Sequence, residues 1–526
     1  PSAAALTLTL AKLSGAAVLL GLVLLGTQAG SYSFEALAHL GPRLDATVRG
    51  LCFALFLVGF ASKAALVPLQ TWVPAAYGEV DADSSGFVAA IALNVAFYAM
   101  LRFWLGFLGH AAIWWAVVVL ALGALTALIG ILGGVLQREL RRFVAYSSVE
   151  NSGLIVADIG IALMGQAQHR PALLELGLVA ATFQIGAHSF AKAGLFGSVA
   201  SVERAQGTSD MDKLGGLYRL LPAATIAALC GAGALAALPP FSGFVSEWLG
   251  LEGLMQGFRV TGTVSQVAMA LTGAVLALTA GLAAFAFVRA IGLTFMGLPR
   301  EERPTAERAP SGRLRSAYES GYQRVALLGL ALASFAMGVA APWVVKVLLR
   351  GTAPIGAGGA AVAHISEPGW LVEPGYTKFS SISPTVLALT LIGFACGAAV
   401  IRLVLSPRRR ARVVPVWASG AVATGRRTQY TALGYSNMVR VIFNVIYRIR
   451  TQLLAHGDER FPERLSMSRA QPRILDPAWL YRPVTAPFLR VADLVRNIQA
   501  GPLGLYLLYL LVVVVVLLIL APRLAG

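Results

Sequence analysis

The chain has 526 residues, of which 57% are hydrophobic and only 13% charged, and its mean hydropathy is +0.72. A soluble globular protein carries about 25% charged residues, so this composition excludes an ordinary soluble fold. Residues 111–136 contain no charge, and 505–520 is nearly all Leu, Val and Tyr. A hydrocarbon core about 30 Å thick needs roughly 20 apolar residues per helix, and these runs are too long for barrel strands. The chain is therefore predicted to be an all-α polytopic membrane protein.

The net charge of +17 lies mostly in segments between the apolar runs. Residues 406–502 hold sixteen arginines, and the shorter segments 137–142 and 299–324 are also basic. Basic loops beside membrane spans mark the cytoplasmic side. The charge is therefore interpreted as a topology signal that places 406–502 in the cytoplasm, and no nucleic-acid partner is expected.

Apolar windows separated by turn residues predict about eleven transmembrane helices in chain order. Two of them are unusually long, and both contain proline. The predicted spans are 5–29, 49–77, 86–108, 111–136, 143–165, 173–200, 219–256, 266–297, 325–349, 383–405 and 503–521.

The two long spans are predicted to be broken helices. One contains Pro68 in Val67-Pro68, and the other contains Pro239 and Pro240 in Leu238-Pro239-Pro240. Proline removes an intrahelical hydrogen bond and kinks or breaks a helix. Broken spans persist where they face protein or a watery cavity, which is how transporters build ion sites. An ordinary proline kink is the alternative.

The basic segment 406–502 is too polar to span a membrane. Within it, Tyr435–Leu454 and Trp479–Ile498 have apolar residues near helical spacing with arginines among them. Such a pattern predicts amphipathic helices that lie along the membrane surface or against a neighbouring subunit.

Ionisable residues inside the predicted spans are the candidates for function. A charge at mid-bilayer costs about 2.5–3.5 kcal/mol or more, so each such residue is a functional hypothesis by default. His188 and Lys192 are four residues apart and share a helical face. Glu150 and Asp158, eight apart, lie on nearly the same face. The candidate proton relay is Lys63, Glu150, Asp158, His188, Lys192 and Glu247.

A structural role is the alternative for some of these residues. Glu150 follows Arg141 and Arg142 closely and can form an ion pair near the interface. Asp158 can satisfy a backbone group or a neighbouring lysine. Lys63 and Lys192 are harder to explain structurally, because neither is close enough to a predicted helix end for its charge to reach the interface.

The chemistry of this set suits proton movement. Separating a lysine from a carboxylate, or joining the two, changes the affinity of the lysine for its proton. Histidine titrates near neutral pH and can link such sites. The three cysteines lack metal-ligand spacing, and no nucleophile–base set or phosphate loop is present. No metal, cofactor or catalytic centre is therefore expected in this chain, and its status as an enzyme stays open.

Four motifs occur in order along the chain. They are Lys63-Ala-Ala-Leu-Val-Pro-Leu-Gln-Thr-Trp-Val-Pro74, Arg142-Phe-Val-Ala-Tyr-Ser-Ser-Val-Glu-Asn151, His188-Ser-Phe-Ala-Lys-Ala-Gly-Leu-Phe196 and Leu238-Pro-Pro-Phe-Ser-Gly-Phe-Val-Ser-Glu-Trp248. With these motifs the chain resembles the antiporter-like subunits of complex I and of Mrp antiporters, and within that superfamily it is most similar to hydrogenase-4 component B and formate hydrogenlyase membrane subunits. The later string Gln429-Tyr-Thr-Ala-Leu-Gly-Tyr-Ser436 supports the same choice.

The resemblance implies two inverted repeats of five helices, each with one broken helix, and a central line of charged residues that conducts protons. Lys63 then belongs to the first broken helix and Glu247 to the second, with His188 and Lys192 as the central link. It also implies other membrane subunits, a peripheral redox arm that holds the metal chemistry, surrounding lipid, and a bacterial cytoplasmic (inner) membrane.

The chain departs from the family pattern in its first half. The family's first five helices, with the glutamate that pairs with the lysine of the first broken helix, are expected to be missing, and Glu35 lies in a loop. Asn94 stands where the next helix usually has a lysine. The usual histidine after the first break is also absent, and Gln70 and Tyr77 occupy that region. These departures put the first half-channel in doubt.

The leading hypothesis is a proton-translocating subunit of a hydrogenase-4, formate hydrogenlyase or complex I-like redox complex. The alternatives are a stand-alone Mrp-type cation/proton antiporter subunit and a non-conducting scaffold for a peripheral enzyme, with energised inorganic-carbon uptake as a related role. The expected division is 1–136 for the rest of the first repeat and the start of the second, 137–298 for the second repeat with its broken helix 219–256, 299–405 for additional transmembrane helices, 406–502 for the basic cytoplasmic amphipathic segment, and 503–526 for a C-terminal transmembrane helix.

Overall fold

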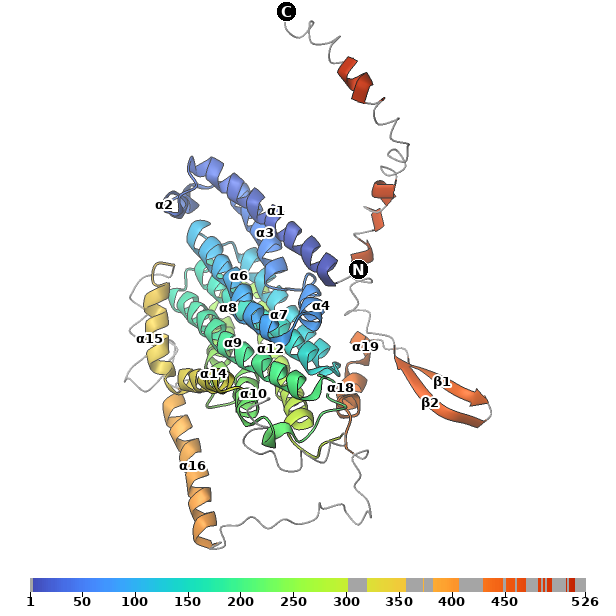
Figure 1. Ribbon diagram of the computed structural model, residues 1–526. Helices are drawn as coiled ribbons and strands as arrows, with labels where there is room; N and C mark the ends of the chain where they lie inside the picture. The colour runs from blue at the N-terminus through green and yellow to red at the C-terminus, as the bar shows by residue number, and fades with distance from the viewer. Residues whose placement is uncertain are drawn as a thin grey trace, which may run out of the picture. The chain divides into compact units, whose positions relative to one another are not determined.

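The computed structural model describes residues 3–300, 319–355, 372, 382–405, 429–447, 451–458 and 461–469, with short stretches at 481–483, 486–487, 490–493, 508 and 510–515. The chain separates into two compact units, Pro1–Ile442 and Phe443–Gly526. In the described residues, the first unit is a bundle of helices (Figure 1).

The long helices of the bundle are α1 (Ala3–Ala29), α3 (Ala46–Lys63), α7 (Ile113–Val135), α8 (Leu140–Ala167), α9 (Pro171–Gln206), α12 (Thr263–Phe295), α14 (Gly321–Val339) and α16 (Pro384–Leu405). Shorter helices are α2 (Phe34–Ala38), α4 (Trp72–Glu79), α5 (Ala82–Phe87), α6 (Leu93–Met100), α10 (Pro222–Leu235), α11 (Ser242–Met255), α15 (Ala341–Thr352), α17 (Ala432–Tyr435) and α18 (Asn437–Ile442). The π-helical turn η2 (Val88–Ala92) joins α5 to α6, and a second one, η3 (Leu101–Phe107), continues α6, so that Ala82–Phe107 forms one span. The 3₁₀ turns are η1 (Gly41–Arg43), η4 (Leu217–Arg219) and η5 (Gln256–Arg259).

Nine helices among the described residues are long and apolar enough to cross a membrane. They correspond to predicted spans, so the all-α polytopic membrane fold is confirmed. The span predicted at 325–349 is two helices, α14 and α15, separated at Ala340. Pro342 lies in the first turn of α15, where proline is tolerated, and it cannot continue α14.

Helix α8 is the centre of the bundle, and every residue from Phe143 to Gly165 is buried. Figure 1 shows α7, α9 and α12 around it. Glycines allow the close approach: a Cβ added at Gly153 of α8 would lie 2.2 Å from the backbone nitrogen of Ala127 in α7. One added at Gly130 of α7 would lie 2.4 Å from the nitrogen of Glu150. Small residues at such crossings are how helices pack tightly in lipid.

Both proline strings interrupt their helices, and the two breaks share one backbone motif. After α3, the N–H of Leu66 donates to the carbonyl of Ala61 at 2.8 Å, and Ala65 has a φ of 56°. After α10, the N–H of Leu238 donates to Gly233 at 2.9 Å, and Ala237 has a φ of 49°. This is a Schellman-type helix end. A left-handed alanine is uncommon, so the surrounding structure must hold it in place.

In the described part of the second unit, a hairpin follows a short helix. The elements are α19 (Asn444–Tyr447), β1 (Thr451–Asp458) and β2 (Phe461–Arg469), and the strands pair antiparallel from Thr451 opposite Arg469. The single helix predicted over Tyr435–Leu454 is therefore wrong in part: the described residues form three short helical pieces and then a strand that begins at Thr451. The second and third pieces begin at Asn437 and Asn444, and asparagine has a low helix propensity.

The other C-terminal expectations fall mostly outside the described residues. Within Trp479–Ile498, the described residues 481–483, 486–487 and 490–493 are helical. Within the predicted last span, 503–521, the described residues 508 and 510–515 are helical.

Candidate functional site

Lys192 of α9 is fully buried and donates to two oxygen atoms of α8. Its Nζ lies 2.9 Å from the carbonyl oxygen of Val144 and 2.5 Å from Oγ of Ser147. A buried charge persists only where polar partners replace water. Lys192, which the sequence predicted as a relay residue, therefore bonds to two neutral oxygen acceptors. It also interacts electrostatically with Glu150.

A chain of buried side-chain amides and hydroxyls continues from that point. The amide of Asn151 donates to the carbonyl of Ser147 at 2.9 Å. Gln184 of α9 then donates from Nε2 to Oδ1 of Asn151 at 2.7 Å. Oγ of Ser246 in α11 donates to Oε1 of Gln184. The polar ladder Lys192–Ser147–Asn151–Gln184–Ser246 thus joins α9, α8 and α11, and it ends one residue before Glu247.

Two candidate relay residues beside this ladder carry buried polar atoms that no described residue satisfies. Neither ring nitrogen of His188 has a hydrogen-bond partner there, and Oε2 of Glu150 has none. Both residues are at most 1% exposed. An unsatisfied buried polar group costs about 1–3 kcal/mol, so native proteins keep such groups mainly where they serve a function.

Glu247 and Asp158 lie on facing helices. Glu247 is half-buried in α11, four residues past Gly243. Asp158 is buried in α8, and a Cβ added at Gly250 of α11 would lie 2.3 Å from its Oδ1. The absence of a side chain at Gly250 therefore lets the Asp158 carboxylate contact α11 one turn beyond Glu247. Glu150 and Asp158 both interact electrostatically with Glu247.

The structure brings Glu150, Asp158, His188, Lys192 and Glu247 together on three helices that pack on one another, α8, α9 and α11. Lys63 is not on these three helices: it is the last residue of α3, just before the first break.

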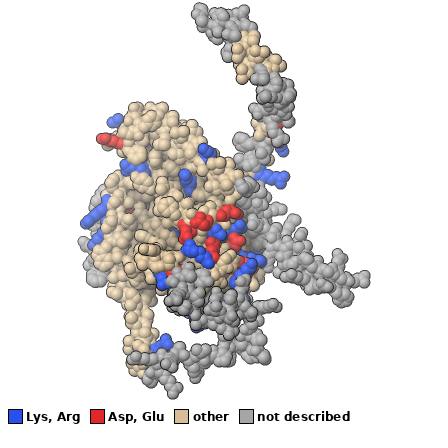
Figure 2. All heavy atoms as spheres, in the orientation of Figure 1, with Lys and Arg blue, Asp and Glu red and all other residues tan. Residues whose placement is uncertain are grey.

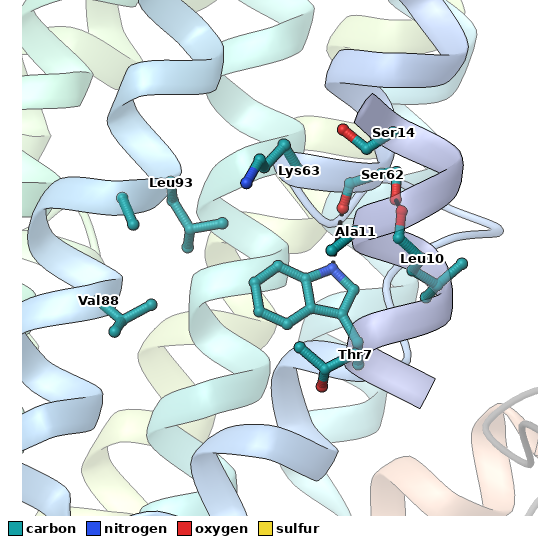
Figure 3. Close-up of a pocket in the computed structure, with 10 residues that line it drawn as sticks. Thr7, Leu10, Ala11, Ser14, Ser62, Lys63, Val88 and Leu93 are labelled. Carbon is teal, nitrogen blue, oxygen red and sulfur yellow. Dashed lines mark hydrogen bonds between the residues drawn. The ribbon is translucent and has the colours of Figure 1, made fainter. Parts of the chain in front are cut away.

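Lys63 does not have the burial expected of it. It is the last residue of α3 and its side chain is exposed. The break begins immediately after it, so its charge is at a helix end after all. Lys63 lines a cavity of about 230 Å³ between α1, α3, α4 and the α5–α6 span (Figure 3). The other lining residues are Thr7, Leu10, Ala11, Ser14, Ser62, Trp72, Val88, Ala92 and Leu93, with no acidic side chain among them.

The break beside Lys63 is held by polar contacts. Nε1 of Trp72 donates to the carbonyl of Ser62 at 2.9 Å, and Oγ of Ser62 donates to the carbonyl of Leu10 at 3.0 Å (Figure 3). The N–H of Val67 donates to Oγ1 of Thr126 at 3.0 Å. These bonds pin the first broken helix to α1 and α7.

Asn94 links the first half to the candidate relay. Its Nδ2 donates to the carbonyl of Ala90 and to Oγ of Ser189, both at 2.6 Å. Ser189 is adjacent to His188 on α9. The uncharged amide of Asn94 therefore contacts α9 directly.

The arginines considered as partners for Glu150 pair elsewhere. Arg141 bonds to Glu203 at 3.0 Å, and Arg142 to Glu139 at 3.1 Å. Figure 2 shows charged side chains gathered in one region of a largely uncharged face, as expected of a surface in contact with lipid. The Arg141–Glu203 pair joins α8 to α9 at the end of the bundle where α8 begins, whereas Arg142 pairs within the start of α8, and Glu150 lies deeper in the bundle.

Sequence reasoning did not identify Ser147, Asn151, Gln184 and Ser246. One signal was available: Gln184, His188 and Lys192 recur every four residues within an apolar span, which places three polar groups on one face. Ser147 and Ser246 carry no such signal, because small hydroxyl residues are common in buried membrane helices. In the described residues, no group of three or more His, Cys, Asp or Glu side chains could hold a metal ion.

Comparisons with known proteins agree with the motif resemblance. The family described as NADH:quinone oxidoreductase/Mrp antiporter, TM matches residues 1–277. Hydrogenase-4 component B of Escherichia coli strain K12 is 29% identical over 503 residues, which cover 94% of this chain and 72% of that protein. Formate hydrogenlyase subunit 3 of the same strain is 33% identical over 295 residues, 56% of this chain and 47% of that protein.

A solved structure shares the fold over nearly the whole chain. It is the membrane-bound sulfane sulfur reductase, described as an archaeal respiratory membrane complex. The TM-score is 0.72 at 21% identity, over 98% of this chain and 76% of that chain.

Proposed function

The chain belongs to the NADH:quinone oxidoreductase/Mrp antiporter family of membrane subunits, and from this premise we propose that it conducts protons as one subunit of a hydrogenase-4-like redox complex. It is a multi-span, antiporter-like membrane subunit related to components of hydrogenase-4 and formate hydrogenlyase. Redox chemistry in partner subunits would drive the movement, and this chain would supply the route.

The polar ladder from Lys192 to Ser246 carries the proposal. It links three packed helices by buried hydrogen bonds, with Lys192 bonded to Oγ of Ser147 and Asn151 bonded to the backbone carbonyl of the same serine. A hydrogen-bonded chain costs much less in a membrane interior than isolated polar groups do. Lys192 is its titratable start, and Glu247 is the residue that follows its last member, Ser246.

Each titratable residue has a role in this proposal. Lys192 holds a proton when its acceptors on α8 and the Glu150 carboxylate are close, and releases it when they separate. His188 relays between Lys192 and the first half, through its neighbour Ser189 and Asn94. Glu247 receives the proton on the broken helix, and Asp158 passes it onward along α11.

The first half supports a smaller part in conduction. Lys63 is exposed to a cavity without a carboxylate in its lining, and Asn94 brings a hydrogen-bonding amide but no titratable group. Lys63 would therefore act with a group supplied by another membrane subunit. In this proposal the end of the bundle where α8 begins faces the cytoplasm of a bacterial inner membrane, because the basic residues 137–142 and 406–502 would share that side, and the peripheral redox arm would dock there.

The decisive experiment uses the intact complex in sealed vesicles. Glu247→Gln and Lys192→Ala should each abolish redox-driven acidification while substrate oxidation by the partner subunits continues. Glu35→Gln and Lys213→Ala are matched controls, because both side chains are exposed and far along the chain from the polar ladder. The controls should acidify at the wild-type rate.

The same assay separates the rival functions. If Glu247→Gln and Lys192→Ala both acidify at the wild-type rate, the relay is wrong and the chain is a scaffold. If acidification needs added Na⁺ or K⁺ and proceeds without the redox substrate, the chain is a cation/proton antiporter instead.

A further inference from the structure

The string Gln429–Ser436 is docked on the helix bundle along its whole length, and these eight residues are called the strap. Nε2 of Gln429 donates to the carbonyl of Leu298 at 3.1 Å. The N–H of Ala432 donates to Oδ1 of Asp212 at 2.6 Å. The ring of Tyr435 packs on that of Phe285 with centroids 4.9 Å apart. The strap therefore belongs to the bundle, although more than 130 residues separate it from α12 in sequence.

The last residue of the strap meets a buried arginine. Arg289 of α12 is 1% exposed, and so is Ser436. Nη1 of Arg289 donates to Oγ of Ser436 at 2.7 Å and to the carbonyl of Val135, and Nη2 donates to the carbonyl of Gly134 at 3.2 Å. Oγ of Ser436 also donates to Val135, at 2.8 Å.

The arginine and the serine together satisfy the end of α7. The last carbonyl groups of a helix have no intrahelical partner, and they attract cations through the helix dipole. Gly134 and Val135 are the last residues of α7 before its cap. The guanidinium thus closes α7 and joins it to α12 and to the strap.

The same arginine acts on the first turns of α8. Its guanidinium carbon lies 5.7 Å from the ring centroid of Phe143, and Phe287 of α12 packs against the same ring at 5.0 Å. The residue after Phe143 is Val144, whose carbonyl accepts from Lys192, and Ser147 is one turn further along. Arg289 therefore fixes the segment that presents both acceptors to Lys192.

We propose that the strap and Arg289 form a latch that positions the first turns of α8, and with them the two oxygen acceptors of Lys192. Arg289 and Ser436 are positioning residues, because they act through α8 and do not touch the polar ladder. The inference rests on the proposed function, since it concerns the rate at which Lys192 transfers its proton. The latch also ties that rate to residues 429–436, which are followed by α18 and then by the second unit.

The test is a double-mutant cycle on acidification rates of the intact complex in sealed vesicles. Ser436→Ala should slow acidification about three- to tenfold, the range expected for losing one buried hydrogen bond. Ser147→Ala removes one acceptor of Lys192 directly. If Ser436 acts through α8 on that acceptor, the double variant should be clearly faster than the product of the two single effects predicts.

A matched cycle uses Ser152→Ala. Ser152 is buried in the same helix as Ser147, but among the described residues its hydroxyl bonds only to the carbonyl of Ser148. Effects of Ser436→Ala and Ser152→Ala should multiply. If the latch only stabilised the fold, the slowing factors of the single variants would multiply in both cycles. That result would overturn the inference, and so would an unchanged acidification rate in Ser436→Ala.

Arg289→Lys gives a second measurement. Lysine keeps the charge but loses the planar fork that reaches two carbonyls and a hydroxyl together, so this variant should assemble and show the same coupling to Ser147→Ala. The same measurements separate a failure of the latch from a failure of the proposed function. If Glu247→Gln abolishes acidification but the single-variant effects multiply in both cycles, the relay stands and only the latch is wrong.

Discussion

The two broken helices share a backbone motif at the break but differ in the residues that surround it. Each contains Ala-Ala-Leu, ends in a left-handed alanine, and is followed by a proline string. The second break lies beside α8 and α9, where Lys192 is fully buried and hydrogen-bonded. The first ends at Lys63, which is exposed to a cavity. A break makes an ion site only when neighbouring helices supply the polar partners.

Burial also differs between the helices around the two breaks. The apolar window of α8 is entirely buried, whereas only 28% of the apolar window of α1 is buried within the chain. The free face of α1 suits contact with lipid or with another membrane subunit. The proposed proton relay therefore lies on helices that pack on one another within this chain.

The largest effect should come from filling the α7–α8 contact. Gly153→Val places atoms within 2.2 Å of the Ala127 backbone, so the helices must separate. A loss of about 3 kcal/mol or more is expected from overpacking against backbone. Thermal unfolding of the purified complex measures it. Gly15→Val in α1, where a side chain meets nothing within 4 Å, is the first-half control, and equal losses would contradict the difference in packing.

The next largest effect contrasts the two lysines. Lys192→Met should slow acidification at least about 100-fold, because no other cation replaces the buried start of the polar ladder. Lys63→Met should slow acidification less than about tenfold, because the Lys63 side chain is exposed and joins no comparable ladder of hydrogen bonds among the described residues. Rates from matched vesicles decide the comparison. A larger loss from Lys63→Met would place the main route in the first half.

An intermediate effect is expected from interrupting the ladder without removing a charge. Gln184→Leu removes the amide that joins Asn151 to Ser246, so Oδ1 of Asn151 loses its donor while the Ser246 hydroxyl keeps only its bond to the carbonyl of Gly243. Acidification should fall about tenfold, while redox turnover by the partners is retained. Gln206→Leu, at the end of the same helix, is the control. A wild-type rate in Gln184→Leu would show that protons bypass the ladder.

The smallest effect should come from Asn94→Ala. This variant loses a hydrogen bond to Ser189 but no titratable group. Acidification should fall no more than about threefold, consistent with one partly buried hydrogen bond. Stopped-flow pH measurement in vesicles resolves a change of this size. A loss as large as that from Gln184→Leu would mean that the first half contributes as much as the second.

Much of the candidate site was predictable because charge in an apolar span is a local signal. His188 and Lys192 stand out at four-residue spacing, and Glu247 follows a proline string. The amides and hydroxyls that connect them carry no comparable signal. Ser246 meets Gln184 across 62 positions of sequence, and no periodicity within one segment reports such a contact. Arg289 was equally visible as a charge in a span, but only its contacts assign it a role.

The sequence by itself determined the class of fold, the positions of both breaks and the set of titratable residues. These follow from composition, proline and the cost of charge in lipid, all of which act within one helix. Only the tertiary structure decided which lysine is buried. Burial depends on which helices surround a residue: α8 and α9 enclose Lys192, whereas α3 ends at Lys63 and leaves its side chain exposed.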